Sequence, residues 1–575
     1  MSFTTRPVVM GANGVVTSTH YLASVAGLKA LQDGGNVVDA GAAMWFCLTL
    51  LKPHLVGPAG EVPILLYWAD EEKVVAVNGQ GPAPMNATID WFHEQGYPMI
   101  PEDGFTPAVV PGSFDAWLMT LEEYGTFTLG RVLEPALRIA RDGFPVYPTL
   151  KAFLERARDR FLSEWPESAE TYLPGGEVPG IGRLLRNPGW YRTFKEVAEA
   201  ESRAGSRSAG IDAARKHFYD GPIARAIVGF TQSFKCRDVY GKENHGLITL
   251  EDFQSYAARF EEPVTVTYRG LDVYKCGPWC QGPVFLQQLN LLEGYDLRGM
   301  GHNTVEYLHT WIECAKLAFA DREQYYADPD YVDVPLGMLL SKEYAEKRRG
   351  LVDPDEASML FRPGGVEPVE LEERSERSGF EGDTVHLDAI DRDGNMLAAT
   401  PSGGWIRASP LVPGLGFPLG TRGQFFHLDQ GHVERLEPGK KPSTTLTPSL
   451  ALKDGRQYMA FGTPGGDRQD QWTLQFFLNH VEFGMNVQEA LDAPTVHSNH
   501  FPGSFWPHTV KPGEVAVEPR IPDEVIRGLK KKGHRVAMSR PWSHGRCLAI
   551  RIDPDTGVMY GGASPRTGEP YALGW

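Results

Sequence analysis

Residues 381–400 of the chain read EGDTVHLDAIDRDGNMLAAT. Polar and apolar side chains alternate from Thr384 to Ile390, which predicts a half-buried β-strand. Asp393-Gly394-Asn395 is a strong tight-turn signal, and Met396 to Thr400 predicts the returning strand of a hairpin. The acidic segment from Phe361 to Asp383 is broken by Pro and Gly, so we expect an exposed approach to this hairpin. By pattern alone, the stretch is a β-hairpin that begins with a Thr.

Helices and strands are also predicted before and after this hairpin. Leucine, valine and alanine recur at helical spacing over residues 22–31, Gly34-Gly35 ends that helix, and a second apolar helix follows over residues 38–51. Two strands are predicted within residues 62–77, on either side of the turn at residues 70–72. Further helices are expected at residues 129–141, 249–257, 304–322, 471–481, 487–491 and 522–532, and a strand pair at 264–268 and 271–274.

The composition limits the class of protein. A chain of 575 residues is long enough for one large two-sheet enzyme or for two or three ordinary domains. With 42% hydrophobic and 22% charged residues it is typical of a soluble globular protein. A formal net charge of −17 argues against nucleic acid or an anionic membrane as partner. We find no apolar run long enough to span a bilayer.

The sequence indicates no secretory signal, no disulfides and no metal site. The start of the chain lacks the apolar core of a secretory signal, so a cytoplasmic location is expected. The six cysteines, at 47, 236, 276, 280, 314 and 547, form no dense framework, which favours buried free thiols over disulfides or zinc. His497 and His500 are expected to be solvated loop residues, and His386 a structural histidine. No cofactor or metal is expected.

Several motifs together resemble one family. Asp-Thr before a strand, the Asp-Gly-Asn turn and the Pro-Gly-Gly segment at 464–466 resemble the γ-glutamyltranspeptidase family of N-terminal nucleophile hydrolases. Gly-Gly-Asn-Val-Val-Asp-Ala at 34–40 and Ala-Phe-Ala-Asp-Arg at 318–322 match the same family. The resemblance covers nearly the whole chain. It implies an α+β fold, the four-layer αββα sandwich of that superfamily.

The resemblance also implies that the chain cuts itself. The cleavage site would be Asp383–Thr384, which divides the chain into residues 1–383 and 384–575 that stay associated in one fold. Thr384 would then be the nucleophile. Its new α-amine has an ordinary pKa of roughly 8, so a useful fraction is a free base at neutral pH, a few bonds from Oγ.

Other site residues follow from the same resemblance. Ser402 falls where the family has a second Thr that hydrogen-bonds the nucleophile. Gly465 and Gly466 would form the oxyanion site, because residues without Cβ let successive backbone N–H groups converge on one oxygen. Thr444 and Thr445 fall where the family holds the substrate carboxylate.

The sequence departs from the family where the glutamyl head group binds. Gln80 aligns with the family's carboxylate-binding Arg, and a neutral amide cannot replace a bidentate guanidinium. No carboxylate remains at Gly404 or at Gln424-Phe425 to pair with a substrate ammonium. Arg422 instead brings a cation to this region. We therefore expect the reaction machinery to be kept and the glutamyl-recognition set to be lost, with Arg422 a candidate to bind a carboxylate on a different acyl group.

The expected function is that of a self-processing γ-glutamyltransferase-like amidohydrolase. It would form an acyl-enzyme at Thr384 and pass the acyl group from a small-molecule amide or γ-glutamyl-type substrate to water or to an amine. One alternative is an acylase or amidase acting on a non-glutamyl acyl group, of the cephalosporin-acylase or oxamate-amidase kind. The other is an inactive single-chain relative that acts by binding. The sequence leaves open the acceptor and any assembly beyond the two fragments.

Overall fold

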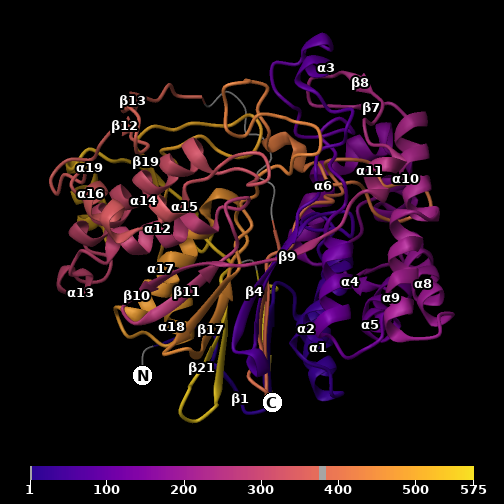
Figure 1. Ribbon diagram of the computed structural model, residues 1–575, viewed down its shortest axis with the longest axis horizontal. Helices are drawn as coiled ribbons and strands as arrows, with labels where there is room; N and C mark the ends of the chain where they lie inside the picture. The colour runs from indigo at the N-terminus through magenta and orange to yellow at the C-terminus, as the bar shows by residue number, and fades with distance from the viewer. Residues whose placement is uncertain (1–2, 375–383, 567) are drawn as a thin grey trace.

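Two seven-stranded sheets lie face to face at the centre of the protein, and helices cover the outer face of each (Figure 1). The computed structural model describes residues 3–374, 384–566 and 568–575. The resulting order of layers is helices, sheet, sheet, helices. This confirms the four-layer αββα sandwich that the resemblance implied.

Sheet I contains the hairpin. Its strand order is β23-β2-β14-β15-β3-β4-β9, with every neighbouring pair antiparallel. The strands are β2 (Gly14–Ser18), β3 (Val62–Trp68), β4 (Lys73–Gly79), β9 (Arg259–Glu261), β14 (Leu387–Asp391), β15 (Met396–Ala399) and β23 (Tyr571–Gly574). The predicted hairpin is therefore confirmed as β14–β15, and it occupies the middle of the sheet.

Strand β14 differs from its prediction in two ways. It begins at Leu387, three residues after Thr384, and all five of its residues are buried. The alternation is real, since Leu387 and Ala389 pack toward the helices while Ile390 packs between the two sheets. Half-burial was wrong because the face opposite the helices is covered by a second sheet, which a local pattern cannot reveal.

Sheet II is also antiparallel, in the order β1-β22-β21-β17-β16-β11-β10. Its strands are β1 (Val9–Gly11), β10 (Val264–Tyr268), β11 (Leu271–Lys275), β16 (Ser449–Lys453), β17 (Arg456–Gly462), β21 (Leu548–Ile552) and β22 (Met559–Ala563). Both sheets take strands from before residue 374 and from after residue 384. The two parts of the chain therefore build one shared core.

The helices against sheet I begin and end where the sequence indicates. Helix α1 (Tyr21–Gln32) is followed by Gly34 at a φ of +90°, a conformation that suits Gly at a helix end. Helix α2 (Val37–Leu51) starts with a capping box between Asn36 and Asp39, and it packs on β14 and β15. Helices α4 (Ser113–Tyr124), α5 (Leu129–Asp142), α8 (Pro188–Ser202) and α9 (Arg207–Tyr219) complete this side.

The other outer layer packs on sheet II. It contains α12 (Gly282–Leu292), α14 (Val305–Tyr325), α17 (Gln469–Val481), α18 (Val487–Asp492) and α19 (Asp523–Lys531). The remaining helices are α3 (Ile89–Glu94), α6 (Pro148–Glu164), α7 (Pro166–Tyr172), α10 (Pro222–Ser233), α11 (Leu250–Gln254), α13 (Leu297–Met300), α15 (Leu336–Leu339) and α16 (Lys342–Arg349). Short strands are β5 (Phe144–Pro145), β6 (Leu184–Leu185), β7 (Cys236–Arg237), β8 (Glu243–Asn244), β12 (Leu360–Phe361), β13 (Val369–Glu370), β18 (Val496–Ser498), β19 (Glu514–Val517) and β20 (Arg535–Met538).

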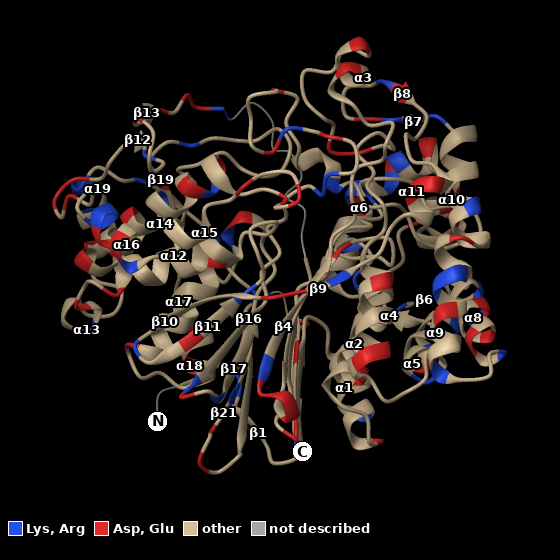
Figure 2. Cartoon of the chain, in the orientation of Figure 1, with Lys and Arg blue, Asp and Glu red and all other residues tan. Residues whose placement is uncertain are grey.

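Acidic and basic side chains are interspersed over the outer helices and loops (Figure 2). Of the approach predicted to be exposed, residues 361–383, the structure describes residues 361–374. Residues 365–374 are largely exposed as expected, whereas residues 362–364 are buried, which the prediction missed. Within residues 3–374, 384–566 and 568–575, no helix is long and apolar enough to cross a membrane. The same residues contain no group of three or more His, Cys, Asp or Glu side chains that could hold a metal ion.

The thiols are as predicted, but two histidines are not. All six cysteines are free and buried. His497 and His500 are 5% and 1% exposed, so the expectation of solvated loop residues was wrong. His497 lies in β18, with its ring 5.3 Å from that of Trp472, and His500 hydrogen-bonds the Leu360 carbonyl. Both are buried because chain segments distant in sequence pack over them.

Candidate active site

Thr384 lies three residues before β14, a central strand of sheet I, and is 1% exposed. The next residue, Val385, donates its backbone N–H to the Pro401 carbonyl at 3.1 Å, which brings Thr384 beside Ser402. Thr384 Oγ1 donates to Ser402 Oγ at 3.4 Å. The pairing expected between these two hydroxyls is therefore present. Asp383, the other half of the expected cleavage site, lies outside the described residues.

Ser402 is fully buried and is fixed by its backbone as well as by its side chain. Its N–H donates to the Glu61 carbonyl, and its carbonyl accepts from the Glu61 N–H, both at 3.0 Å. A Cβ on Gly60 would lie 2.0 Å from the Ser402 carbonyl oxygen, so only Gly allows the two segments to approach this closely. The segment before β3 thereby holds Ser402 in place.

Arg422 lies within one hydrogen bond of Ser402. It begins the short 3₁₀ helix Arg422–Phe425 and is fully buried. Its Nη2 donates to Ser402 Oγ at 3.1 Å, and both Nε, at 2.8 Å, and Nη2 donate to Glu61 Oε1. The guanidinium carbon lies 5.0, 4.6 and 5.5 Å from the ring centres of Trp405, Phe425 and Phe505.

This arrangement changes what Arg422 can do. Its carboxylate partner is Glu61 of the same chain, and the two side chains of this ion pair are 0% and 1% exposed. Glu61 takes Nε and Nη2, whereas Nη1 is buried and has no hydrogen-bond partner among the residues that the structure describes, so Nη1 is the donor that a substrate carboxylate could reach without displacing Glu61. The sequence patterns did not single out Glu61. The available signal was an acidic residue directly before the apolar strand β3.

Gly465 and Gly466 form a turn between β17 and α17. Their φ values are +144° and +58°, in the region that favours Gly. A Cβ on Gly465 would lie 2.3 Å from Trp472 Cζ3, and one on Gly466 would lie 3.1 Å from Phe505 Cε2. Since Phe505 also faces Arg422, the turn belongs to the same region as Ser402. Its N–H groups lie just before a helix, where backbone donors suit an anion.

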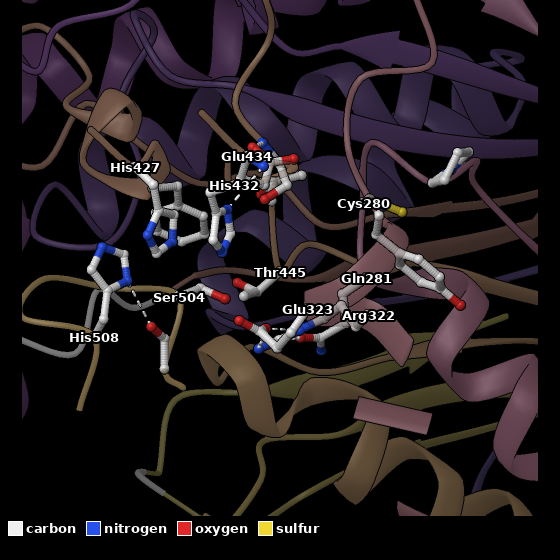
Figure 3. Close-up of a pocket in the computed structure, with 16 residues that line it drawn as sticks. Cys280, Gln281, Arg322, Glu323, His427, His432, Glu434, Thr445, Ser504 and His508 are labelled. Carbon is white, nitrogen blue, oxygen red and sulfur yellow. Dashed lines mark hydrogen bonds and ion pairs between the residues drawn. The ribbon is translucent and has the colours of Figure 1, made fainter. Parts of the chain in front are cut away.

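A partly open pocket adjoins this centre, and Thr444 and Thr445 are among its lining residues (Figure 3). Thr445 Oγ1 is buried and has no hydrogen-bond partner among the residues that the structure describes. Phe425 connects the pocket to Arg422. The lining residues are Pro278, Cys280, Gln281, Arg322, Glu323, Tyr326, Phe425, His427, His432, Glu434, Ser443, Thr444, Thr445, Gly503, Ser504 and His508.

The basic and acidic groups of the pocket are mostly neutral or already paired. Burial lowers the pKa of His432 to about 4 and raises the pKa of Glu434 to about 8. The His427 ring stacks on His432, with 3.6 Å between ring centres. Arg322 donates to Asp467 at 2.6 Å and to Glu323 at 2.8 Å. The pocket therefore offers hydroxyls and neutral rings beside a cation that already has two carboxylate partners.

Gln80 is not among the residues that line this pocket. It is fully buried, directly after β4, whose last residue Gly79 pairs with Val62. Its Nε2 donates to the Gly81 carbonyl at 3.3 Å. Gln80 is therefore buried beside the Glu61 segment, and it does not line the pocket that contains the two threonines.

Comparison with known proteins gives one consistent result. The family model described as Gamma-glutamyltranspeptidase matches residues 23–573. The chain is 33% identical to a glutathione hydrolase-like YwrD proenzyme of Bacillus subtilis strain 168, over 98% of this chain and 99% of that protein. The solved structure of LmbA2991HD is 44% identical, covers 100% of both chains and has a TM-score of 0.95. A cephalosporin acylase from Bacillus halodurans is 32% identical, covers 100% of this chain and 98% of its own, and has a TM-score of 0.85.

Proposed function

Because the chain belongs to the gamma-glutamyltranspeptidase family, we propose that it is a self-cleaving amidohydrolase whose nucleophile is Thr384 and whose acyl substrate is not γ-glutamyl. The observation that carries the proposal is the buried contact between Thr384 Oγ1 and Ser402 Oγ, which Arg422 extends. A hydroxyl held in this way, three residues before a fixed strand, suits a nucleophile.

Self-cleavage would come first. Thr384 Oγ attacks the Asp383 carbonyl carbon, and the hydroxyl proton passes to the Thr384 nitrogen as the C–N bond breaks. The product is an ester between Asp383 and Thr384. The α-amine of Thr384 is free from this point, and water then opens the ester, which leaves a carboxylate at Asp383 and restores the Thr384 hydroxyl. Before the C–N bond breaks, the nitrogen is an amide and cannot act as a base.

Turnover would repeat the chemistry on an external amide. The α-amine of Thr384 takes the Oγ proton while Oγ attacks the substrate carbonyl, and the backbone N–H groups of Gly465 and Gly466 stabilise the oxyanion. The ammonium proton passes to the leaving amine, which departs and leaves an acyl ester on Oγ. Water, or an acceptor amine, releases the acyl group by the same route.

The choice of acyl group rests on the partners of the nearby charges. A free amino-acid head group needs a cation for its carboxylate and an anion for its ammonium. Arg422 bonds Glu61 through Nε and Nη2, and its Nη1 alone is without a partner among the described residues. Arg322 is occupied by Asp467 and Glu323, and the neutral amide of Gln80 supplies no charge. What remains near Thr445 is hydroxyl and aromatic surface. These groups favour an acyl chain without an α-amino-acid head, as expected of an acylase.

A panel of three p-nitroanilides tests the proposal. γ-Glutamyl-, glutaryl- and phenylacetyl-p-nitroanilide are compared by kcat/KM in wild-type protein and in Thr384→Ala. We expect the glutaryl or phenylacetyl compound to be turned over at least tenfold better than the γ-glutamyl compound, with no turnover by Thr384→Ala. Preferential turnover of the γ-glutamyl compound would refute the acyl assignment. An active Thr384→Ala variant would refute the nucleophile, and an uncut, inactive wild type would favour a binding protein.

A further inference from the structure

The buried ion pair beside the nucleophile gives Glu61 a role. We propose that Glu61 is a positioning residue of the reaction centre: it fixes the Arg422 guanidinium against Ser402, so that the cation polarises the Ser402 hydroxyl next to Thr384 Oγ. This inference rests on the proposed function, because it assumes that Thr384 reacts. It adds a residue that neither the family motif nor the pocket indicates.

The contacts run without a break from Glu61 to Thr384. Glu61 Oε1 accepts from both Nε and Nη2 of Arg422, and the same Nη2 donates to Ser402 Oγ at 3.1 Å. Ser402 Oγ in turn accepts from Thr384 Oγ1 at 3.4 Å. Because a guanidinium is planar, two bonds to one carboxylate oxygen set the orientation of the third group that it reaches. The position of Glu61 therefore determines where Arg422 meets Ser402.

Glu61 reaches Ser402 by a second path as well. Its backbone N–H and C=O both bond the backbone of Ser402 at 3.0 Å. The carboxylate and the hydroxyl thus move together, which keeps Arg422 aligned with both. Trp405, Phe425 and Phe505 surround the guanidinium, where the faces of aromatic rings favour a cation. These rings carry no charge, so the neutralising anion of the buried cation is Glu61.

The chemical consequence concerns the charge that forms on Thr384. When Thr384 Oγ loses its proton and attacks, the Ser402 hydroxyl, which until then accepts from Thr384, turns to donate to Oγ and stabilises the developing negative charge. A donor that is itself bonded to a cation is stronger than a neutral one, and a buried site weakens this effect less than water does. Arg422 acts through Ser402 in this scheme, and Glu61 acts through Arg422. Loss of either is expected to slow the reaction more than it weakens substrate binding.

Four variants separate this role from a merely structural ion pair. Glu61→Gln and Arg422→Met each remove one charge and leave the other buried without a partner, which destabilises a protein. The double variant Glu61→Gln/Arg422→Met removes both charges, so its stability is expected to return toward that of the wild type. Glu313→Gln is the matched control, because Glu313 is a buried Glu of α14 that pairs with Lys316 and Arg362 in the outer layer.

Each variant is measured for melting temperature, half-time of self-cleavage by intact mass, and kcat and KM on glutaryl-p-nitroanilide. We expect Glu61→Gln and Arg422→Met to lower kcat about 10- to 100-fold and to slow self-cleavage, with KM changed less than about threefold. The double variant should be stable and should remain as slow as Arg422→Met. Glu313→Gln should lower the melting temperature and leave kcat unchanged.

Two results would overturn the inference. One is a folded Glu61→Gln or double variant whose self-cleavage and kcat match those of the wild type. The other is a double variant slower than Arg422→Met by the full effect of Glu61→Gln, because independent effects would mean that Glu61 does not act through Arg422. Should Glu61→Gln fail to fold, the double variant decides alone. Activity in Thr384→Ala would instead refute the proposed function, so failure of the proposed function can be distinguished from failure of the role of Glu61.

Discussion

Ser402→Ala is the substitution that tests the nucleophile's surroundings most simply. The change removes a single oxygen atom from a fully buried side chain. That oxygen accepts from Thr384 Oγ1 at 3.4 Å and from Arg422 Nη2 at 3.1 Å. Alanine therefore separates Thr384 from the cation without adding bulk or charge.

The size of the effect differs between stability and rate. Arg422 keeps its bonds to Glu61, so the free energy of unfolding should fall by only about 1–2 kcal/mol, the cost of one buried hydrogen bond. In the transition state the lost bond acts on a developing charge, and hydrogen bonds to charged groups contribute about 1.5–3 kcal/mol. That range corresponds to a fall in kcat of about 10- to 150-fold.

The assay is hydrolysis of glutaryl-p-nitroanilide, with thermal melting measured on the same samples. Ser409→Ala is the matched control, because Ser409 is also fully buried and bonds a backbone carbonyl, that of Leu419, at 3.0 Å. It should show a similar loss of stability and a normal kcat. Ser402→Thr, which keeps the hydroxyl, should stay within about tenfold of the wild type. The reasoning is refuted if folded Ser402→Ala keeps the wild-type kcat, or if Ser409→Ala is equally slow.

Three further outcomes are expected. Gly465→Ala should lower the free energy of unfolding by about 3 kcal/mol and abolish activity, because φ is +144° and the new Cβ would lie 2.3 Å from Trp472. The control is Gly484→Ala, at a φ of +68° with open space around it. It should lower the free energy of unfolding by about 1 kcal/mol and leave kcat normal. Burial raises the pKa of Glu434 to about 8 from its ordinary 4.5, so the folded protein favours the protonated carboxyl. Melting curves should therefore show the wild type losing stability relative to Glu434→Gln as the pH rises from 4.5 through 8. The six buried thiols should react with a disulfide reagent only after unfolding in guanidinium, and rapid labelling of the native protein would contradict their burial.

Much of the fold was readable from local sequence signals. The hairpin β14–β15 follows from alternation and an Asp-Gly turn, and α2 follows from an Asn cap before an apolar run. Such signals are local because turn geometry and helix capping involve neighbours within a few residues. The distance between Thr384 and Ser402 follows from the same hairpin, since the two residues flank its strands.

The rest depends on contacts between distant segments. Glu61 and Arg422 are 361 positions apart, and nothing in either local pattern indicates that they pair. His500 is buried by a segment near Leu360, 140 positions away. Sequence reasoning could identify Arg422 as an unusual cation but not its partner. The expected role of Arg422 in binding a substrate carboxylate stays a prediction. The carboxylate that Arg422 contacts in the structure is that of Glu61.

Intact-mass analysis of freshly purified active protein, with N-terminal sequencing of the lighter fragment, tests the central claim most directly. The account predicts two associated fragments, residues 1–383 and 384–575, with Thr384 as the first residue of the second. Thr384→Ala should give one uncut, inactive chain. A fully active preparation made only of unbroken chains would contradict the account.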